Sequence, residues 1–457
     1  MKIDKISLNR TKIFFSVYLF FNSISFVIHA LLPSYLNYKT SEAISATVFD
    51  GPWCSPATQG LGVHCFGDFY YSIQFANLDN PWSGKANPYP PLGTAFFKPF
   101  TLLDQFFPNT RLALIIYLIL CLICLFFPVY HAKKTQNLSL QSIAVVVSII
   151  VTSTPILMGL DRGNLQLVIF PFLYLFCHDV IISKNSTFIW GVVLVLFKPQ
   201  MILLGIIFVA HREWKNLRRW LLLNILASFF AFLIYPIHIK ENVLSYFAQM
   251  VNYQNYTNAG SPNPANISIA STWFTLERII TTILPSHFSK DPNGRWSYYP
   301  NWITVIMFFL VVILVGVYGR ERSRFENLYI AILMPILFTN VTFGYYLSIL
   351  LPPLILHFIA CKNYYRSENI TEVKGSRTQY FHRFMSLEKK SIWLTFTFTY
   401  VLLMIPWGLP WRIFPGFHYF FWSSIGVNWL FGQIFLLIFF INLIFLGAKR
   451  PQIKISL

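Results

Sequence analysis

The sequence predicts an all-α membrane protein with about 12 transmembrane helices. Of its 457 residues, 55% are hydrophobic, 18% are aromatic and only 11% are charged, and the mean hydropathy is +0.55. A water-soluble domain of this length cannot bury so much apolar surface in one core. Many of the apolar residues also form runs of about 20, the length of a helix that spans a bilayer. We therefore expect residues 1–457 to form a single integral membrane domain.

The first apolar run and the long loop after it set the orientation of the chain. The run covers residues 13–32 and is longer than the core of a usual signal peptide, so an uncleaved first span is expected. A loop over about residues 33–110 follows it. Within this loop, residues 67–80 and 91–107 carry aromatic faces at helical spacing, which predicts two helices that lie in the membrane interface.

Hydropathy predicts the remaining spans, and one of the apolar runs is interrupted by polar residues. Lys198-Pro199-Gln200 stands in the middle of an apolar run, where a charge is costly and proline breaks the hydrogen-bond ladder, so two short helices meeting at Lys198 are expected. A second long polar loop covers about residues 238–301. The second and third spans are expected over about residues 111–130 and 140–158, and the fourth ends at about residue 182. The interrupted run covers about residues 188–210 as two halves, and the span after it ends at about residue 235. The remaining spans are expected over about residues 302–318, 327–340, 345–360, 391–406 and 427–447.

The distribution of charge gives an independent test of this topology. With the N-terminus in the cytoplasm, 24 of the 35 Lys and Arg residues fall in cytoplasmic segments, including a basic segment over about residues 361–390. Acidic residues divide almost equally, 8 inside and 9 outside. This positive-inside bias explains the net charge of +18 without nucleic acid as a partner. It puts both termini in the cytoplasm, and both long loops, Arg162 and Lys198 on the outer side.

Metal, cofactor and nucleotide chemistry have no signature in the sequence. It contains no Walker A, GxGxxG, HExxH or GxSxG motif, and its His residues are dispersed, so we expect no metal and no cofactor. The six Cys residues are scattered. Only Cys54 and Cys65 share a loop, and the sequence leaves open whether they form a disulfide or are free thiols.

Asp68 is the favoured acid of the first outer loop. It follows Gly67 and precedes an aromatic run, so it would be held at the bilayer surface beside aromatic side chains. Desolvation there would favour its use as a general base. An isolated loop acid is more often a solvated charge, and Asp50 and Asp79 are weaker candidates than Asp68.

Lys198 is the most informative cation. A Lys followed by Pro in an apolar run is hard to explain by packing, and an anionic lipid phosphate is its natural partner. Arg162 and Arg295 are possible helpers, although Arg295 also fits a simple loop charge. The run from Asp161 to Asn164 fits either a ligand site or a helix cap with an interfacial Arg.

The order of these motifs resembles glycosyltransferase family 87, the polyprenol-phosphate-mannose-dependent mannosyltransferases of the GT-C membrane superfamily. The resemblance runs from the first span to about residue 350. It implies a GT-C fold, a lipid-phosphate sugar donor and an active site on the outer face. It also implies that Asp68 is the general base and that Asn164 and Lys198 lie near the donor phosphate. The motifs are Gly67-Asp68-Phe69-Tyr70-Tyr71, Asn87-Pro88-Tyr89-Pro90-Pro91-Leu92, Gly163-Asn164-Leu165-Gln166, Lys198-Pro199-Gln200 and Asn266-Ile267-Ser268.

The chain departs from the family in one late turn. Many members have an aromatic residue and His there, whereas this chain has Thr342-Phe343-Gly344-Tyr345-Tyr346. A Tyr can hydrogen-bond a sugar or a phosphate, but the role of the His cannot be carried over, and this leaves the identity of the donor more open than the fold.

The leading hypothesis is a glycosyltransferase of the cell envelope, in the inner (plasma) membrane. It would move a sugar, mannose by the resemblance, from a polyprenyl phosphate to a lipid-linked or periplasmic acceptor. The first alternative is a lipid or polyol transporter or flippase with no transferase activity, since Lys198 in a broken helix also suits a substrate path. A third possibility is a non-catalytic membrane assembly partner, in which Asp68 would be dispensable. The residues expected to bind the donor phosphate are Lys198, Arg162 and Asn164, and those expected to bind substrate are Tyr70, Tyr71, Tyr89, Asn266, Tyr345 and Tyr346.

Overall fold

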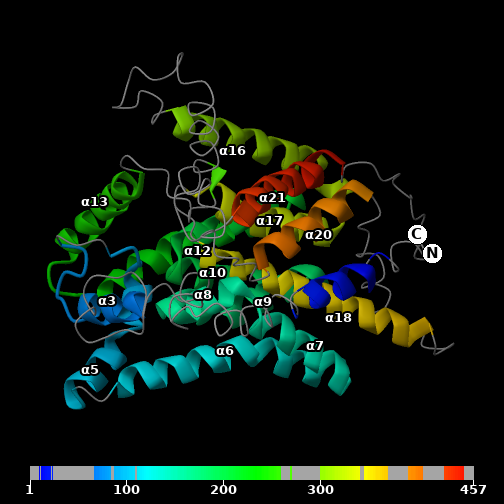
Figure 1. Cartoon of the computed structure of the whole chain (residues 1–457). Coiled ribbons are helices and arrows are strands. Elements are labelled where there is room, and N and C mark those ends of the chain that lie inside the picture. Colours follow the sequence, from blue (N-terminus) through cyan, green and yellow to red (C-terminus); the bar gives the residue numbers. More distant parts are fainter. Residues whose placement is uncertain are drawn as a thin grey trace, which may run out of the picture.

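A computed structural model of the chain is mostly helical (Figure 1). Within the described residues it contains no strand. Cys54, Cys65, Asn266 and Arg295 lie outside the described part of the chain. The structure describes residues 10, 12–21, 23, 66–83, 87–108, 111–258, 268–269, 299–339, 344–368, 390–404 and 427–446.

The described part of the long loop after the first apolar run forms short helices. The aromatic pattern predicts helices over residues 67–80 and 91–107, and the second of these is divided into two. The observed helices are α3 (Gly67–Ala76), α4 (Pro91–Ala95) and α5 (Lys98–Phe106), and they precede the long helix α6 (Leu112–Gln136). Pro90 and Pro91 fix the start of α4, because proline suits the first helical position. In Figure 1, α3 and α5 lie together at one end of the molecule, beside α13 (Ile239–Asn258).

Two of the predicted spans are broken helices. The third consists of α7 (Leu140–Val151) and α8 (Thr154–Arg162). The run around Lys198 consists of α10 (Thr187–Phe197), the 3-10 helix η3 (Pro199–Gly205) and α11. Lys198 has an extended backbone between α10 and η3, with φ −144° and ψ 101°, as expected for a residue before proline. The predicted interruption at Lys198 is therefore confirmed.

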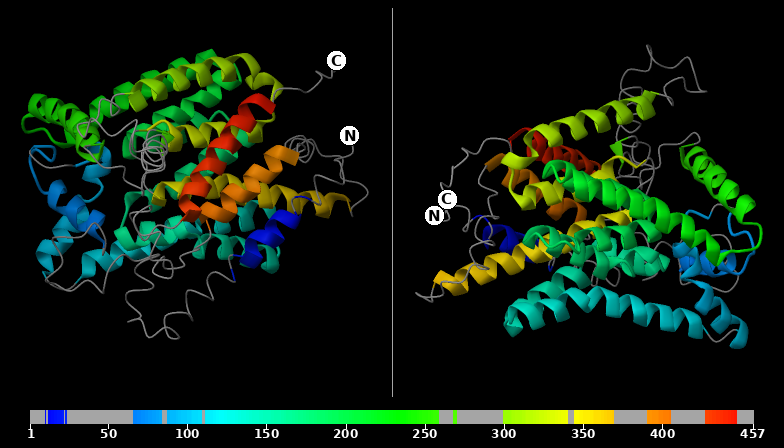
Figure 2. Two further views of the ribbon diagram at one scale, coloured as in Figure 1. Left: turned by 45° about the horizontal axis from the view of Figure 1, so that its top comes forward. Right: turned by 180° about the vertical axis from the view of Figure 1, so that it is seen from behind.

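The other elements form the rest of the bundle. In Figure 1 and in the right view of Figure 2, α6 and α16 lie on opposite sides of it, with α9, α10 and α17 between them. The elements are η2 (Leu165–Leu167), α9 (Phe170–Ile182), α11 (Ile206–Ala210), α12 (Trp214–Ala231), η4 (Phe232–Ile234), α16 (Tyr299–Tyr318), η6 (Gly319–Glu321), α17 (Arg324–Leu337), η7 (Gly344–Leu350), α18 (Leu351–Glu368), α20 (Lys390–Met404) and α21 (Val427–Leu446).

Helix α17 forms the centre of the core. Every residue from Phe325 to Leu337 is buried, as expected for a helix surrounded by other helices. Its first turn is closed by a capping box, in which the Ser323 hydroxyl accepts from the Glu326 N–H and the Glu326 carboxylate accepts from the Ser323 N–H. The capping box thus defines the residue at which this buried helix begins.

Four helical segments in the described residues are long and apolar enough to cross a membrane. They cover Leu112–Gln136, Leu165–Ile182, Trp214–Ile234 and Thr304–Glu321. Seven further apolar helices are only 10–17 residues long. The membrane character is supported, but a count of 12 spans is not confirmed, because breaks such as the one at Lys198 divide apolar runs into shorter helices.

Several turns predicted to be cytoplasmic meet in space. The Arg324 Nη1 donates to the Val180 carbonyl at 3.0 Å, and the Arg212 Nε donates to the Gly316 carbonyl at 3.2 Å. The first contact joins the start of α17 to the end of α9, and the second joins the turn after α11 to the end of α16. The C-terminal end of α16 points away from α3 and α13 in Figures 1 and 2. The turns at residues 183–186, 211–213 and 319–323 therefore lie at the same end of these helices, and their cytoplasmic location stays a prediction.

Candidate functional site

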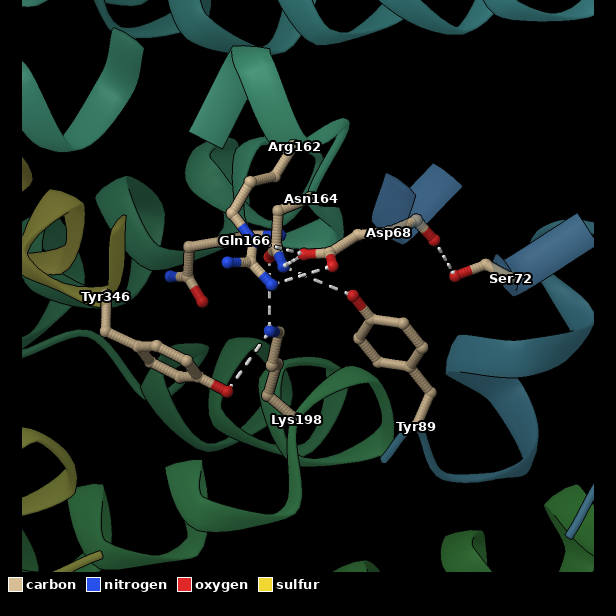
Figure 3. Close-up of polar contacts among 8 residues, drawn as sticks. All are labelled: Asp68, Ser72, Tyr89, Arg162, Asn164, Gln166, Lys198 and Tyr346. Carbon is tan, nitrogen blue, oxygen red and sulfur yellow. Dashed lines mark hydrogen bonds and ion pairs between the residues drawn. The ribbon is translucent and has the colours of Figure 1, made fainter. Parts of the chain in front are cut away.

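Asp68, Arg162 and Asn164 form the centre of a polar cluster (Figure 3). The Arg162 guanidinium pairs with both carboxylate oxygens of Asp68, through Nε to Oδ2 at 3.1 Å and Nη2 to Oδ1 at 3.0 Å. Asn164 Nδ2 donates to Asp68 Oδ2 at 2.5 Å. The side chains of Arg162 and Asp68 are 12% and 16% exposed. This two-pronged pairing fixes the plane of the carboxylate and leaves it in contact with solvent.

Asn164 connects the acid to Lys198. Its Oδ1 accepts from the Lys198 Nζ at 3.3 Å, while its Nδ2 donates to Asp68. The Lys198 Nζ also donates to the Tyr346 hydroxyl at 3.3 Å, and Lys198 is only 3% exposed. One acid and two cations therefore share a small volume, which favours an anionic ligand.

Three Tyr rings surround the cations. The Lys198 Nζ lies 4.5 Å from the centre of the Tyr346 ring and 5.2 Å from that of Tyr89. The Arg162 guanidinium carbon lies 5.1 Å from the centre of the Tyr345 ring. Aromatic faces attract cations and are also common surfaces for sugar rings. The expected residues Tyr89, Tyr345 and Tyr346 are thus brought to the same cluster as Asp68 and Lys198.

Gly163 lets α8 approach α3 closely. It ends α8 with a positive φ of 62°, and a Cβ at this position would lie 2.8 Å from the Cβ of Phe69. Glycine adopts this conformation without strain and leaves room for the neighbouring backbone. Arg162 and Asn164, on either side of Gly163, consequently face Asp68 across the contact.

Tyr89 is held by a network of local hydrogen bonds. Asn87 Oδ1 accepts from the Tyr89 N–H at 3.1 Å, and Trp82 Nε1 donates to the Tyr89 carbonyl at 3.0 Å. Trp82 is itself buried against Phe232, Tyr235 and Tyr246. Both the backbone N–H and the carbonyl of Tyr89 are therefore held by hydrogen bonds, and this positions the ring. Trp82 also packs against its aromatic neighbours.

The Asp68 carboxylate provides the counter-charge of Arg162. Burial alone would lower the pKa of the Arg162 guanidinium, but the Asp68 carboxylate outweighs this effect and raises the pKa of Arg162 above its ordinary value. Arg162 therefore remains a cation. Burial also raises the pKa of the Tyr70 phenol, so its hydroxyl is protonated at neutral pH.

The other expected substrate residues are not joined to the cluster by the described contacts. Tyr70 packs edge-on against Phe69, and Tyr71 is 42% exposed and stacks on Phe75 of the same helix. Asn266 lies outside the described residues. The roles expected for Tyr70, Tyr71 and Asn266 remain predictions.

Two Gln residues near the cluster were not among the expected site residues. The Gln200 Nε2 donates to the Tyr346 hydroxyl at 2.6 Å. Gln166 is fully buried two residues after Asn164, and its backbone N–H donates to Asn164 Oδ1 at 2.9 Å. Both stand in motifs that carry the resemblance, and their polar side chains in apolar runs are the sequence signal that would have indicated them. Among the described residues, no group of three or more His, Cys, Asp or Glu could hold a metal ion.

Fold and cluster together define a helical membrane protein with a charged site between its helices. The pattern of glycosyltransferase family 87 matches residues 87–363, more than half of the chain, and the chain belongs to this family. The match includes Arg162, Asn164, Lys198 and the Tyr pair, whereas Asp68 precedes it. Comparisons with curated proteins and with solved structures give no match. The chain is therefore a membrane glycosyltransferase, which acts on a sugar donor and an acceptor.

Proposed function

We propose that this glycosyltransferase moves mannose from a polyprenyl phosphate to a hydroxyl of a lipid-linked or periplasmic acceptor. The observation that carries the proposal is the hydrogen-bonded chain from Asp68 through Asn164 to Lys198. It holds a carboxylate and a buried cation on opposite ends of one amide. Sugar transfer from a phosphate requires one group of each kind, on opposite sides of the anomeric carbon.

Asp68 is the general base in this reaction. The acceptor hydroxyl attacks the anomeric carbon, and its proton passes to the Asp68 carboxylate as the new C–O bond forms. The proton becomes acidic only as the oxygen bonds to carbon, so a carboxylate paired with Arg162 can still accept it. Arg162 and Asn164 orient the carboxylate, and its partial exposure leaves room for the acceptor.

Lys198 stabilises the leaving group. Breakage of the bond between the anomeric carbon and the phosphate oxygen turns a phosphodiester with one negative charge into a polyprenyl phosphate with up to two. A cation fixed at the departing oxygen stabilises the charge that develops in the transition state. Arg162 adds a second positive charge nearby, and Asn164 positions Lys198.

The membrane environment fits a lipid-borne donor. Lys198 lies between two short apolar helices, α10 and η3, so the phosphate of a polyprenyl chain can reach it while the chain stays in lipid. The charge distribution of the sequence supports an outer-face site, because Asp68, Arg162 and Lys198 belong to segments with few other cations. The three Tyr rings offer faces on which a sugar can stack.

The test is sugar transfer by the purified chain. Protein in detergent is given radiolabelled mannosyl polyprenyl phosphate and an alkyl mannoside as acceptor. We expect labelled product from the wild type, a fall in kcat of about 100-fold or more in Asp68→Asn, and a fall of about 100-fold in Lys198→Met. Lys215→Met, at an exposed position on α12, is the control and should match the wild type.

Each part of the proposal can fail separately. Wild-type turnover in Asp68→Asn would reject Asp68 as the base. Transfer from glucosyl but not mannosyl polyprenyl phosphate would reject mannose. Movement of a fluorescent polyprenyl phosphate across vesicles without any product would support the transporter alternative.

A further inference from the structure

Gln166 presents a buried primary amide with no partner for its side chain. The residue is 0% exposed, and neither Oε1 nor Nε2 has a hydrogen-bond partner among the described residues. In Figure 3 this amide lies at the edge of the cluster, on the side of Tyr346 and opposite Asp68. An amide buried without partners is costly, and each such group in a folded protein requires an explanation.

The position of Gln166 is fixed by the site itself. Its backbone N–H donates to Asn164 Oδ1, the same atom that accepts from the Lys198 Nζ. Gln200 provides a contrast, because its amide is used internally and donates to the Tyr346 hydroxyl. Of these two amides, only that of Gln200 has a described partner. The amide of Gln166 is thus the one whose hydrogen-bonding groups are not used within the described part of the chain.

We propose that Gln166 binds a hydroxyl group of the transferred sugar and so forms a sugar subsite beside the phosphate site. The inference rests on the proposed function. A primary amide needs both an acceptor for its N–H groups and a donor for its oxygen. A sugar hydroxyl supplies both, whereas the oxygens of a phosphodiester only accept. Gln166 therefore complements the sugar, and Lys198 complements the phosphate.

The neighbouring side chains suit a sugar. The rings of Tyr345 and Tyr346 stack on each other with centres 4.9 Å apart, which makes an aromatic surface beside the Lys198 ammonium. A hexose has hydroxyl groups at its edge and C–H groups on its faces, so an amide and aromatic rings in one cluster match both. Because Gln166 is fully buried, a sugar reaches it only when the side chains around it move apart.

The first test compares donors that differ in one hydroxyl. The variant Gln166→Met keeps the length of the side chain and removes both hydrogen-bonding groups. With mannosyl polyprenyl phosphate we expect its kcat/KM to fall about 10- to 100-fold. A set of donors, each lacking one hydroxyl of the mannose, is then given to both proteins. For the donor that lacks the contacted hydroxyl, wild type and Gln166→Met should be equal. Gln105→Met, at an exposed Gln of α5, is the control and should match the wild type with every donor.

The second test measures binding without turnover. Thermal unfolding is followed with polyprenyl phosphate and with mannosyl polyprenyl phosphate. The wild type should be stabilised more by the lipid that carries the sugar, and Gln166→Met should lose only this sugar-dependent increase. Without ligand, Gln166→Met should be at least as stable as the wild type, since it removes an unpaired buried amide. A purely structural Gln would instead give a less stable variant.

The outcomes separate this inference from the proposed function. If the wild type transfers mannose but Gln166→Met is impaired equally with every deoxy donor, or keeps the sugar-dependent stabilisation, Gln166 does not bind the sugar. If the wild type neither turns over nor is stabilised by mannosyl polyprenyl phosphate, the proposed function fails and the subsite fails with it.

Discussion

The Asn164 side chain uses both ends of its amide, and this decides how the acid and the cation of the site are arranged. Nδ2 donates to the Asp68 carboxylate and Oδ1 accepts from the Lys198 ammonium. Neither Asp nor Leu at this position could do both. Asp68 and Lys198 are thus joined through one amide, while the direct ion pair of Asp68 is with Arg162.

At the residue scale, the pairing of Asp68 with Arg162 allows the contribution of Asp68 to stability to be measured separately from its contribution to catalysis. In Asp68→Asn the partly buried Arg162 loses its counter-charge, and we expect a loss of about 1–3 kcal/mol in the free energy of unfolding. The double variant Asp68→Asn with Arg162→Gln removes both charges and should recover most of this loss. Thermal unfolding in detergent measures the stability of each variant, and transfer from mannosyl polyprenyl phosphate measures its activity.

Activity should stay low in the double variant although its stability returns. If activity recovers together with stability, then Asp68 acts only by pairing with Arg162, and its role as a base is rejected.

The sequence predicted individual charged residues better than it predicted their contacts. Asp68 and Lys198 stand out because each is a charge beside apolar or aromatic residues, and that signal is local. The bond from Arg162 to Asp68 joins residues 94 positions apart, and hydropathy carries no information on it. Gln166 lacks a charge, so its place in an apolar run is a weaker signal than that of Lys198, and its unpartnered buried amide is seen only in the folded chain.

At the element scale, helix breaks decide where the site lies. The break at Lys198 was predicted, since proline and a charge in an apolar run have local consequences. The break between α7 and α8 was not predicted, and its effect is to carry Arg162 and Asn164 to α3. Hydropathy counts apolar residues but does not show where a continuous run is divided, so the number of full spans could not be derived from it.

Gly163→Ala tests the contact between α8 and α3. The new Cβ would lie 2.8 Å from the Phe69 Cβ, and the positive φ is unfavourable for Ala, so we expect a loss of about 1–3 kcal/mol in stability. Activity should fall as well, because Asp68 and Arg162 move apart. Gly316→Ala is the matched control, since its Cβ meets Val209 only at an ordinary 3.5 Å. Equal thermal unfolding of the two variants would show that the approach at Gly163 is not required.

At the scale of the whole molecule, the proposed site and the turns joined by Arg212 and Arg324 lie in different parts of the bundle. The end with α3, α5 and α13 carries the proposed site, whereas the turns joined by Arg212 and Arg324 lie together elsewhere. The charge bias of the sequence predicts that the first end faces outward and the second faces the cytoplasm. The contacts of Arg212 and Arg324 bring together turns that the bias assigns to one side, and the side that each end faces stays a prediction.

Cysteine labelling of intact spheroplasts measures this orientation. Asn77→Cys, at the exposed end of α3, and Lys215→Cys, at an exposed position near the start of α12, are each treated with a membrane-impermeant maleimide. We expect labelling of the first in intact spheroplasts and of the second only after the membrane is permeabilised. The parent chain, treated in parallel, gives the background from native cysteines. The reverse pattern would place the Asp68 end in the cytoplasm, and a polyprenyl-phosphate donor would then have to present its sugar on that side.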